Sequence, residues 1–459
     1  MENDRITSVG IFFDGTGNNG INAASAEMPV KNNESYQGAP TNIYKLFGLF
    51  NGDCRLYVEG IGTLTGGEDR NFAMATCANP PGEKGYSSDD KLQKAYDFAE
   101  SIMIDQNRIY HFYIYGFSRG SMLARHFSNQ LLIQYPSANI KIKFLGVFDT
   151  VESKPFNTYE VQLSQQVENA LHIGAVNECR YFFPLTGFFE NSASLKDTKT
   201  ETLNTVWKEI FVPGAHADVG GGYLEGPQSV YISTDFMNVN DLRNYVSDIR
   251  NAKTDADGNK IWDSLLSEFQ IDKGEWLSQA YVARNRVYNE LSKIYGQLML
   301  EETNTIKPEI FSTHLKEQDL DVDPENHPFL SDFYSRLKAY ALNMEPEQKP
   351  QYDYRRFAEY THISANFGLY SDGLLKKSAE EVRAELINNG LNVPSSSSLD
   401  HKSHMKVLTE LHLPEDSFIP DFLYGTNIPN NDIWSRTVEM KKKGSGMLKE
   451  GNYGRLKTE

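Results

Sequence analysis

One serine of this chain has the sequence context of an activated nucleophile. Ser118 lies in Gly116-Phe117-Ser118-Arg119-Gly120, between an apolar run and an amphipathic segment. In that context the Gly-x-Ser-x-Gly pattern is typical of a nucleophile elbow, the strained turn of a serine hydrolase. A serine hydroxyl needs a base that takes its proton and fixed donors for the oxyanion, and we expect the N–H of Arg119 to be one donor. The alternative is a glycine-rich turn with an idle serine.

An acid and a histidine follow Ser118 at the places where an α/β-hydrolase carries them. In that fold both come later in the chain, each near the end of a strand. Asp149 follows the apolar run 144–148, and His216 follows the run 206–212. The sequence therefore predicts the catalytic triad Ser118, Asp149 and His216. A helix cap for Asp149 and a structural loop histidine for His216 are the alternatives.

Two further loops carry residues that support this chemistry. Asp14 to Gly17 follow a first apolar run, where a second oxyanion donor usually arises, and the N–H of Gly15 or Thr16 is expected to supply it. Asp14 itself either takes part or braces the loop. Asp218 either orients His216 in competition with Asp149 or caps the turn that follows.

The elements around these residues alternate short apolar runs with amphipathic segments. This alternation predicts βα units and a mostly parallel sheet that is covered on both faces. One helix is expected to begin at residues 87–89, and another follows Ser118 with Leu123, Phe127 and Leu131 on one face. The carboxyl ends of parallel strands share one edge, where a site is usually built. The predicted strands are 9–13, 56–58, 109–115, 140–148 and 206–212.

The chain beyond residue 223 has a more helical pattern. Leu277 to Leu298 form one apolar stripe at helical spacing, and Phe333, Leu337 and Met344 form a shorter one. A capping box at Ser378 begins another predicted helix, and the serines at 395–398 indicate a linker. At 459 residues, we expect a catalytic core at 1–225, a helical insertion or lid with the rest of the catalytic domain at 226–390, and a C-terminal segment and tail at 391–459.

Composition excludes several classes of function. A formal net charge of −17 makes nucleic acid an unsuitable partner. Three cysteines without paired short spacing predict neither a disulfide framework nor a zinc site, and the acidic segments 255–263 and 319–323 lack the EF-hand pattern. We expect no metal and no other cofactor. The chain shows no secretory signal and no transmembrane stretch, so we expect synthesis in the cytoplasm; if the protein leaves its cell, a dedicated machine must carry it.

The chain resembles the first family of type VI secretion lipase effectors, whose α/β-hydrolase domain was formerly of unknown function. The resemblance covers residues 5–225 and implies phospholipid acyl ester cleavage by Ser118, Asp149 and His216. A late His-x-Ser element at 360–364 makes His362 a second choice for the base, and the segment 177–184 is a weaker match. The resemblance rests on Phe12 to Asn19, Tyr115 to Gly120, Gly146 to Val151 and Pro213 to Tyr223.

This resemblance implies a phospholipase of the A type that attacks a rival bacterium. Its expected partners are a phospholipid membrane surface, a secretion spike or adaptor protein, and a cognate immunity protein. Its expected destination is the periplasm of a target cell. The aromatic cluster at 181–189 is suited either to acyl-chain contact or to a buried core.

Other functions remain open. The same triad serves a carboxylesterase or thioesterase that acts on a soluble small ester. Asp14, Asp149, His216 and Asp218 are the residues that a metal-dependent phosphohydrolase would use. An interaction module that keeps the fold without the chemistry belongs to a different class.

Overall fold

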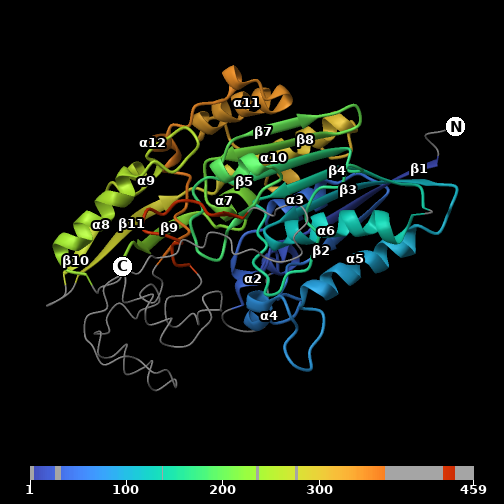
Figure 1. Ribbon diagram of the computed structural model, residues 1–459, viewed down its shortest axis with the longest axis horizontal. Helices are drawn as coiled ribbons and strands as arrows, with labels where there is room; N and C mark the ends of the chain where they lie inside the picture. The colour runs from blue at the N-terminus through green and yellow to red at the C-terminus, as the bar shows by residue number, and fades with distance from the viewer. Residues whose placement is uncertain are drawn as a thin grey trace.

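A seven-stranded sheet forms the centre of this computed structural model, which describes residues 5–25, 33–136, 138–233, 237–273, 278–366 and 427–439. The strand order is β2-β1-β3-β4-β5-β8-β7 (Figure 1), and only β7, at one edge, runs antiparallel to its neighbour. The predicted mixed α/β class with a mostly parallel sheet is confirmed. The strands are β1 (Ile6–Phe13), β2 (Cys54–Val58), β3 (Ile109–Phe117), β4 (Ile140–Phe148), β5 (Asn169–Ala175), β7 (Thr198–Glu201) and β8 (Val206–Val212).

Alternating side chains bury both faces of this sheet. Phe12 and Tyr115 pack on one face with the apolar side chains of α3 (Asn42–Leu49) and α10 (Glu290–Ile306). Ile11 and Ile114 pack on the other face with α5 (Ser88–Ile102) and α6 (Arg119–Gln134). Helices cover both faces of the sheet (Figure 1), and the near-continuous apolar runs of these strands follow from this two-sided burial.

Local signals place the helices that flank the site. The Ser87 hydroxyl accepts a hydrogen bond from the Asp90 N–H (3.1 Å) and caps α5, as the 87–89 start predicted. Helix α6 begins directly after Ser118 and buries Leu123, Phe127 and Leu131. The predicted strands and both of these helices are therefore confirmed.

A second, smaller sheet follows the first and has the order β10-β11-β9. It corrects one prediction, because residues 278–287 form strand β11 and helix α10 begins only at Glu290. Ala280 and Val282 are both buried, and this spacing of two residues is the period of a strand and not of a helix. The elements of this region are β9 (Gly226–Tyr231), α8 (Val239–Asn251), α9 (Ile261–Leu265), β10 (Gln270–Lys273) and β11 (Ser278–Val287).

The second predicted stripe lies in α11 (Pro328–Asn343), which buries Phe333 and Leu337, while Met344 is its C-cap. The features predicted at 378–390 and 395–398 lie outside the described residues, and the domain boundaries at 225 and 390 stay predictions. The other α-helices are α1 (Gly20–Ala23), α2 (Glu34–Gln37), α4 (Asn71–Thr76), α7 (His216–Gly220) and α12 (Tyr354–Phe357). Three 3-10 helices span Glu190–Ser194, Leu315–Gln318 and Pro346–Gln348. Two short strands, β6 (Leu185–Thr186) and β12 (Val438–Glu439), pair with each other.

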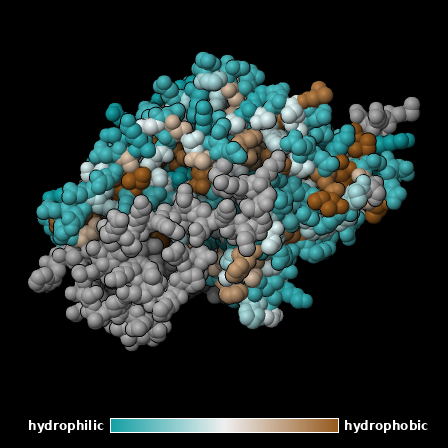
Figure 2. All heavy atoms as spheres, in the orientation of Figure 1, coloured by the Kyte–Doolittle hydropathy of each residue, from teal (hydrophilic) through white to brown (hydrophobic). Residues whose placement is uncertain are grey.

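The molecular surface is mainly hydrophilic in the view of Figure 2, and hydrophobic side chains gather toward the side where β1 begins. Among the described residues, no helix combines the length and the apolar character needed to cross a bilayer. The parallel strands run from the side where β1 begins to the opposite side of the sheet, where their carboxyl ends lie. There β1, β3 and β4 end immediately before Asp14, Ser118 and Asp149, and His216 begins the turn helix after β8.

We expect Gly120→Ala to destabilise the protein, because a methyl group there would lie 2.3 Å from the Asp14 carbonyl oxygen and 2.5 Å from that of Phe13. Overpacking against backbone atoms should lower the free energy of unfolding by roughly 1–3 kcal/mol. Gly226→Ala is the matched control, since no atom lies within 4 Å of its added methyl group. Urea unfolding of the two variants tests this, and equal midpoints would contradict it.

Candidate active site

Ser118 occupies a strained turn between β3 and α6. Its backbone has φ 57° and ψ −130°, a region that residues with a side chain rarely adopt. The Ser118 N–H donates to the Phe148 carbonyl (3.0 Å), and its own carbonyl accepts from Ser121 (3.0 Å) and Val151 (3.3 Å). A methyl group on Gly116 would lie 2.5 Å from Ser121 Cα, which explains the first glycine of the pattern. The turn is therefore held by strand β4 and by the start of α6.

Asp149 is fully buried at the end of β4. Its N–H donates to the Ile173 carbonyl (2.8 Å), and its Oδ1 accepts from the Ala175 N–H (2.8 Å). Its Oδ2 accepts from His216 Nδ1 (2.5 Å) and from Arg436 Nη2 (3.0 Å). Burial by itself raises the pKa of Asp149, but the Arg436 charge and the His216 hydrogen bond outweigh it and lower the pKa to about 2. Asp149 is thus a carboxylate at neutral pH.

His216 lies against aromatic rings at this edge. Its ring centroid is 4.5 Å from that of Phe117 and 5.0 Å from that of Phe183. Burial lowers the pKa of His216 below its usual 6.5, and the Asp149 contact opposes this only in part. Since Asp149 is ionised, the neutral imidazole carries its proton on Nδ1 and leaves Nε2 as an acceptor. That is the protonation state of a general base.

Phe117 connects three loops of the site. A methyl group built on Gly15 would lie 2.7 Å from the Phe117 ring, and one on Gly220 would lie 2.1 Å from it. The ring thus occupies the space beside these two glycines and also contacts His216. The loop after β1, the turn that carries Ser118 and the short helix α7 therefore pack on one another.

Glu178 and Arg180 form an ion pair beside His216. Arg180 donates to both carboxylate oxygens of Glu178 (3.0 Å each), and the His216 backbone N–H donates to Glu178 Oε2 (3.2 Å). The guanidinium of Arg180 also lies 3.4 Å from the centroid of Phe183. Burial raises the pKa of Glu178, but Arg180 outweighs it and lowers the pKa to about 2. The pair therefore fixes the backbone of His216 and the ring of Phe183.

A second carboxylate–histidine pair joins Asp218 to His362. The distance between Asp218 Oδ1 and His362 Nδ1 is 2.6 Å, and Asp218 Oδ2 accepts from the N–H groups of His362 (2.8 Å) and Ala215 (2.9 Å). The His362 ring also stacks on Tyr223 at 4.3 Å. Asp218 hence closes the turn before His216 and pairs with His362, so it does not compete with Asp149 for His216.

Asp14 braces the loop after β1. Its Oδ1 accepts from the Gly15 N–H (2.8 Å) and the Thr41 hydroxyl (2.7 Å), and its Oδ2 accepts from the Tyr57 hydroxyl (2.6 Å). Burial raises the pKa of Asp14 to about 6, although all three hydrogen bonds lower it. Of the two roles foreseen for Asp14, these contacts are those of a brace.

The backbone donors foreseen for the oxyanion differ in their hydrogen bonds. The Gly15 N–H is already bonded to Asp14. Within the described ranges, no acceptor is found for the N–H groups of Thr16 and Arg119. Thr16 lies in the loop after β1, the strand beside β3, and Arg119 is the first residue of α6, directly after Ser118.

Three supporting residues were missed by sequence reasoning. Arg436 donates to Asp149 from a position 287 residues away, and no sequence signal connects the two. Glu178 lies in the segment 177–184, whose weaker resemblance was the only signal. His172 accepts from the Thr150 N–H (3.1 Å) and contacts Glu209 (2.7 Å), but it belongs to β5, a strand that the sequence pattern did not reveal.

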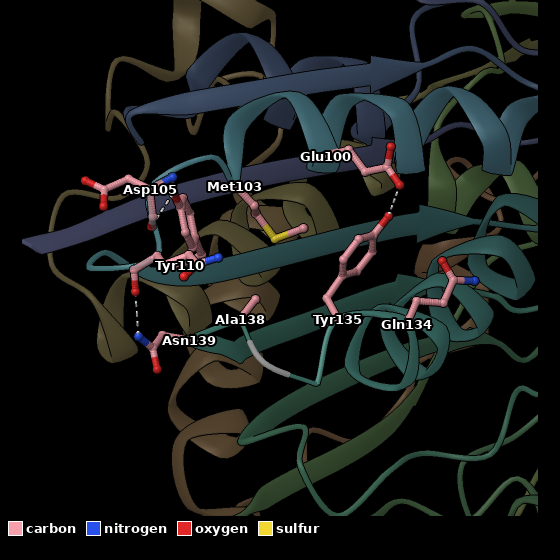
Figure 3. A pocket seen from close by; sticks show the side chains of 9 residues that line it. Glu100, Met103, Asp105, Tyr110, Gln134, Tyr135, Ala138 and Asn139 are labelled. Atoms are coloured by element: carbon pink, nitrogen blue, oxygen red, sulfur yellow. Dashed lines mark hydrogen bonds between the residues drawn. The ribbon is translucent and has the colours of Figure 1, made fainter.

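A hollow of about 220 Å³ lies at the other edge of the sheet, away from Ser118. Figure 3 shows Tyr110 and Asn139 around it, next to the starts of β3 and β4, and Tyr135 donates to Glu100 there (2.6 Å). Nothing in it resembles the histidine and carboxylate pairs at the Ser118 edge. Across the described part of the chain, no group of three or more His, Cys, Asp or Glu side chains is arranged to hold a metal ion.

One solved structure that shares this fold is described as the Tle1 effector bound to the VgrG spike from the type 6 secretion system. It is 19% identical, has a TM-score of 0.55, and the match covers 94% of this chain and 93% of that one. A crystal structure of an uncharacterized protein from Pseudomonas aeruginosa is 15% identical at a TM-score of 0.38, and the match covers 93% of this chain and 65% of that one. No curated protein matches the sequence.

A family model identifies the chain more directly. The model for the type VI secretion system phospholipase effector Tle1-like catalytic domain matches residues 8–135 and 130–240, which together make up just over half of the chain. The matched region contains β1, β3, β4 and β8, with Asp14, Ser118, Asp149 and His216 at their ends. The chain therefore belongs to the family of Tle1-like phospholipase effectors of the type VI secretion system.

Proposed function

We propose that this chain is a phospholipase of the A type, in which Ser118, Asp149 and His216 act as nucleophile, acid and base. The observation that carries the proposal is the 2.5 Å contact between His216 Nδ1 and the buried Asp149 carboxylate, at the edge where Ser118 occupies its strained turn. Family membership supports the phospholipase class.

The chemistry follows from the protonation states. His216 Nε2 takes the proton of the Ser118 hydroxyl as Oγ attacks the acyl carbonyl, and Asp149 stabilises the imidazolium that forms. His216 then returns this proton to the departing lysophospholipid oxygen, which leaves the fatty acyl group on Ser118. Water, deprotonated by His216, releases the fatty acid and restores the serine.

Two backbone N–H groups are the proposed oxyanion donors. Those of Thr16 and Arg119 have no acceptor within the described ranges, so they are available for the negative charge that develops on the carbonyl oxygen. The Gly15 N–H is our less favoured candidate, because it already donates to Asp14.

Apolar side chains near the site are suited to a lipid. Phe117 and Phe183 contact the His216 ring, and the aromatic cluster at 181–189 is half-buried over most of its length. Phe156, on the segment that follows Asp149, is 90% exposed, and Leu224, after the His216 turn, is 59% exposed. We propose these two side chains, each on a segment that follows a site residue in the chain, as points of contact with a membrane surface. A soluble ester is the alternative substrate.

The chain's place in the secretion system is also proposed. The related Tle1 effector was solved bound to a VgrG spike, so we propose a spike or adaptor protein as carrier. We further propose the periplasm of a target cell as the destination and an immunity protein that blocks access to Ser118 in the producer.

We expect Ser118→Ala to abolish the release of fatty acid and lysophospholipid from defined phospholipid vesicles, with a loss of several orders of magnitude, because only the activated hydroxyl forms the acyl-enzyme. Product identification also reveals the acyl position that is cut. Ser128→Ala is the matched control, since its buried hydroxyl donates to a carbonyl within the same helix. Activity on a soluble ester but never on phospholipid would favour the esterase alternative.

His216→Ala should reduce turnover about as severely as Ser118→Ala, because members of a triad act as one unit. His362→Ala should reduce it by less than about tenfold, roughly 1.4 kcal/mol of transition-state stabilisation. The two histidines are well matched, since each is nearly buried and each contacts an aspartate through Nδ1. Initial rates of the folded variants on one ester compare them. If His362→Ala is the inactive variant, the base is misassigned.

Directing the chain to the periplasm tests the effector proposal. A secretory signal fused to the full chain should make expression toxic in a bacterium without the immunity protein, whereas the Ser118→Ala fusion should be harmless. Growth curves at matched periplasmic levels give the comparison. Equal toxicity of the two fusions would instead indicate an effect without catalysis, as expected of an interaction module.

A further inference from the structure

Residues 427–439, here called the C-terminal strap, lie across the segment that leads from β5 to β6. The strap accepts hydrogen bonds from Tyr181 N–H (2.9 Å, at the Ile428 carbonyl) and Leu185 N–H (2.8 Å, at the Thr437 carbonyl). Its β12 pairs in parallel with β6, and it is the red segment beside α7 and β9 in Figure 1. The strap is therefore part of the folded structure around the site.

Trp434 anchors the strap in the core of the smaller sheet. Its side chain is fully buried, and its Nε1 donates to the Tyr245 hydroxyl (3.0 Å). The indole of Trp262 donates to the Trp434 carbonyl (2.9 Å), and the two rings lie edge to face at 5.5 Å. Arg436 follows only two residues later, so its position is fixed by this anchor.

The Arg436 side chain lies completely buried at the acid of the proposed triad. Its Nη2 donates to Asp149 Oδ2 (3.0 Å) and its Nη1 to the Ala175 carbonyl (3.4 Å). Asp149 Oδ2 is the same oxygen that accepts from His216 Nδ1. A buried guanidinium needs such a partner, and removing one member of a buried pair leaves the other charge uncompensated.

We propose that Arg436 is a positioning residue of the active site, which fixes the Asp149 carboxylate and limits how strongly it stabilises the protonated form of His216. The inference rests on the proposed triad. It concerns a residue outside the matched catalytic-domain region, which ends at residue 240.

Two effects of Arg436 on catalysis follow from its position. Its hydrogen bond to Oδ2 fixes the orientation of the Asp149 carboxylate. The carboxylate in turn orients the His216 ring, and this favours turnover. Its positive charge also cancels part of the negative charge that would stabilise an imidazolium, and this keeps the base neutral to lower pH. Removing the charge should therefore raise the pKa of His216, while loss of orientation should lower kcat.

Among the described residues, none of the other charged groups near His216 is hydrogen-bonded to Arg436, although the charge of Arg436 also lowers the pKa of Glu178. These groups are Glu178, which accepts from the His216 backbone N–H, and Arg180, which is paired with Glu178. Asp218, two residues along the chain, is paired with His362. A shift in the pH profile of an Arg436 variant therefore reports the loss of the guanidinium charge, which acts on both Asp149 and Glu178.

The test compares the full-length chain with Arg436→Met, Arg436→Lys and Arg125→Met. Arg125 is the matched control, because its buried guanidinium donates to the carbonyls of Val161, Thr186 and Gly187 and not to Asp149. The measurements are kcat and KM on one soluble ester from pH 4 to 9, the pH dependence of fluorophosphonate labelling of Ser118, and the melting temperature.

For Arg436→Met we expect a fall in kcat of about 10- to 100-fold with little change in KM, and an acid limb of kcat/KM that moves to higher pH by about one unit. Arg436→Lys keeps a cation and should keep the limb within a few tenths of a unit of wild type. Arg125→Met should lower the melting temperature without moving the limb.

Superimposable pH profiles of wild type and Arg436→Met would overturn the inference, even if the variant were less stable. Should Arg436→Met fail to fold, Arg436→Gln takes its place, and identical limbs for the Gln and Lys variants would likewise overturn it. Failure of the proposed triad looks different, since wild-type protein would then neither turn over an ester nor be labelled at Ser118, whereas activity on soluble ester alone would count against the phospholipid substrate and not against the triad.

Discussion

The arrangement of this site depends on how the buried carboxylate of Asp149 is stabilised. Because no solvent reaches it, its charge must be met entirely by protein donors, and three of them converge on its two oxygens. The Ala175 N–H comes from the end of β5, the His216 imidazole from the turn after β8, and the Arg436 guanidinium from the C-terminal strap. The sheet order, which puts β4 beside β5 and β5 beside β8, makes this convergence possible.

The fold, and the placement of Ser118, Asp149 and His216 at the ends of strands, could be predicted wherever the signal is local. Ser118, Asp149 and His216 each follow a strongly apolar run, and parallel strands bring such ends to one edge. The prediction of one helix from the apolar stripe Leu277 to Leu298 was wrong in its first part. Tyr281 belongs to strand β11 and falls only by coincidence at helical spacing from the apolar residues of helix α10. Arg436 could not be found, since its partner is fixed by tertiary packing across 287 residues.

The two histidine–aspartate pairs show how similar local chemistry acquires different surroundings. His362 is bound through both its ring and its backbone N–H to Asp218, and it stacks on Tyr223. His216 contacts Asp149 only through its ring and lies between the rings of Phe117 and Phe183. The sequence presents both as plausible bases, and only the packing tells which carboxylate each one faces.

The strap also bears on how the molecule is made. A ribosome synthesises every strand of the seven-stranded sheet, from β1 to β8, before it reaches residue 436. The nascent sheet can therefore form while Asp149 still lacks its guanidinium donor, and this centre is completed only when residues 427–439 emerge and Trp434 docks. Chains still under synthesis near the ribosome therefore lack an intact Asp149 centre.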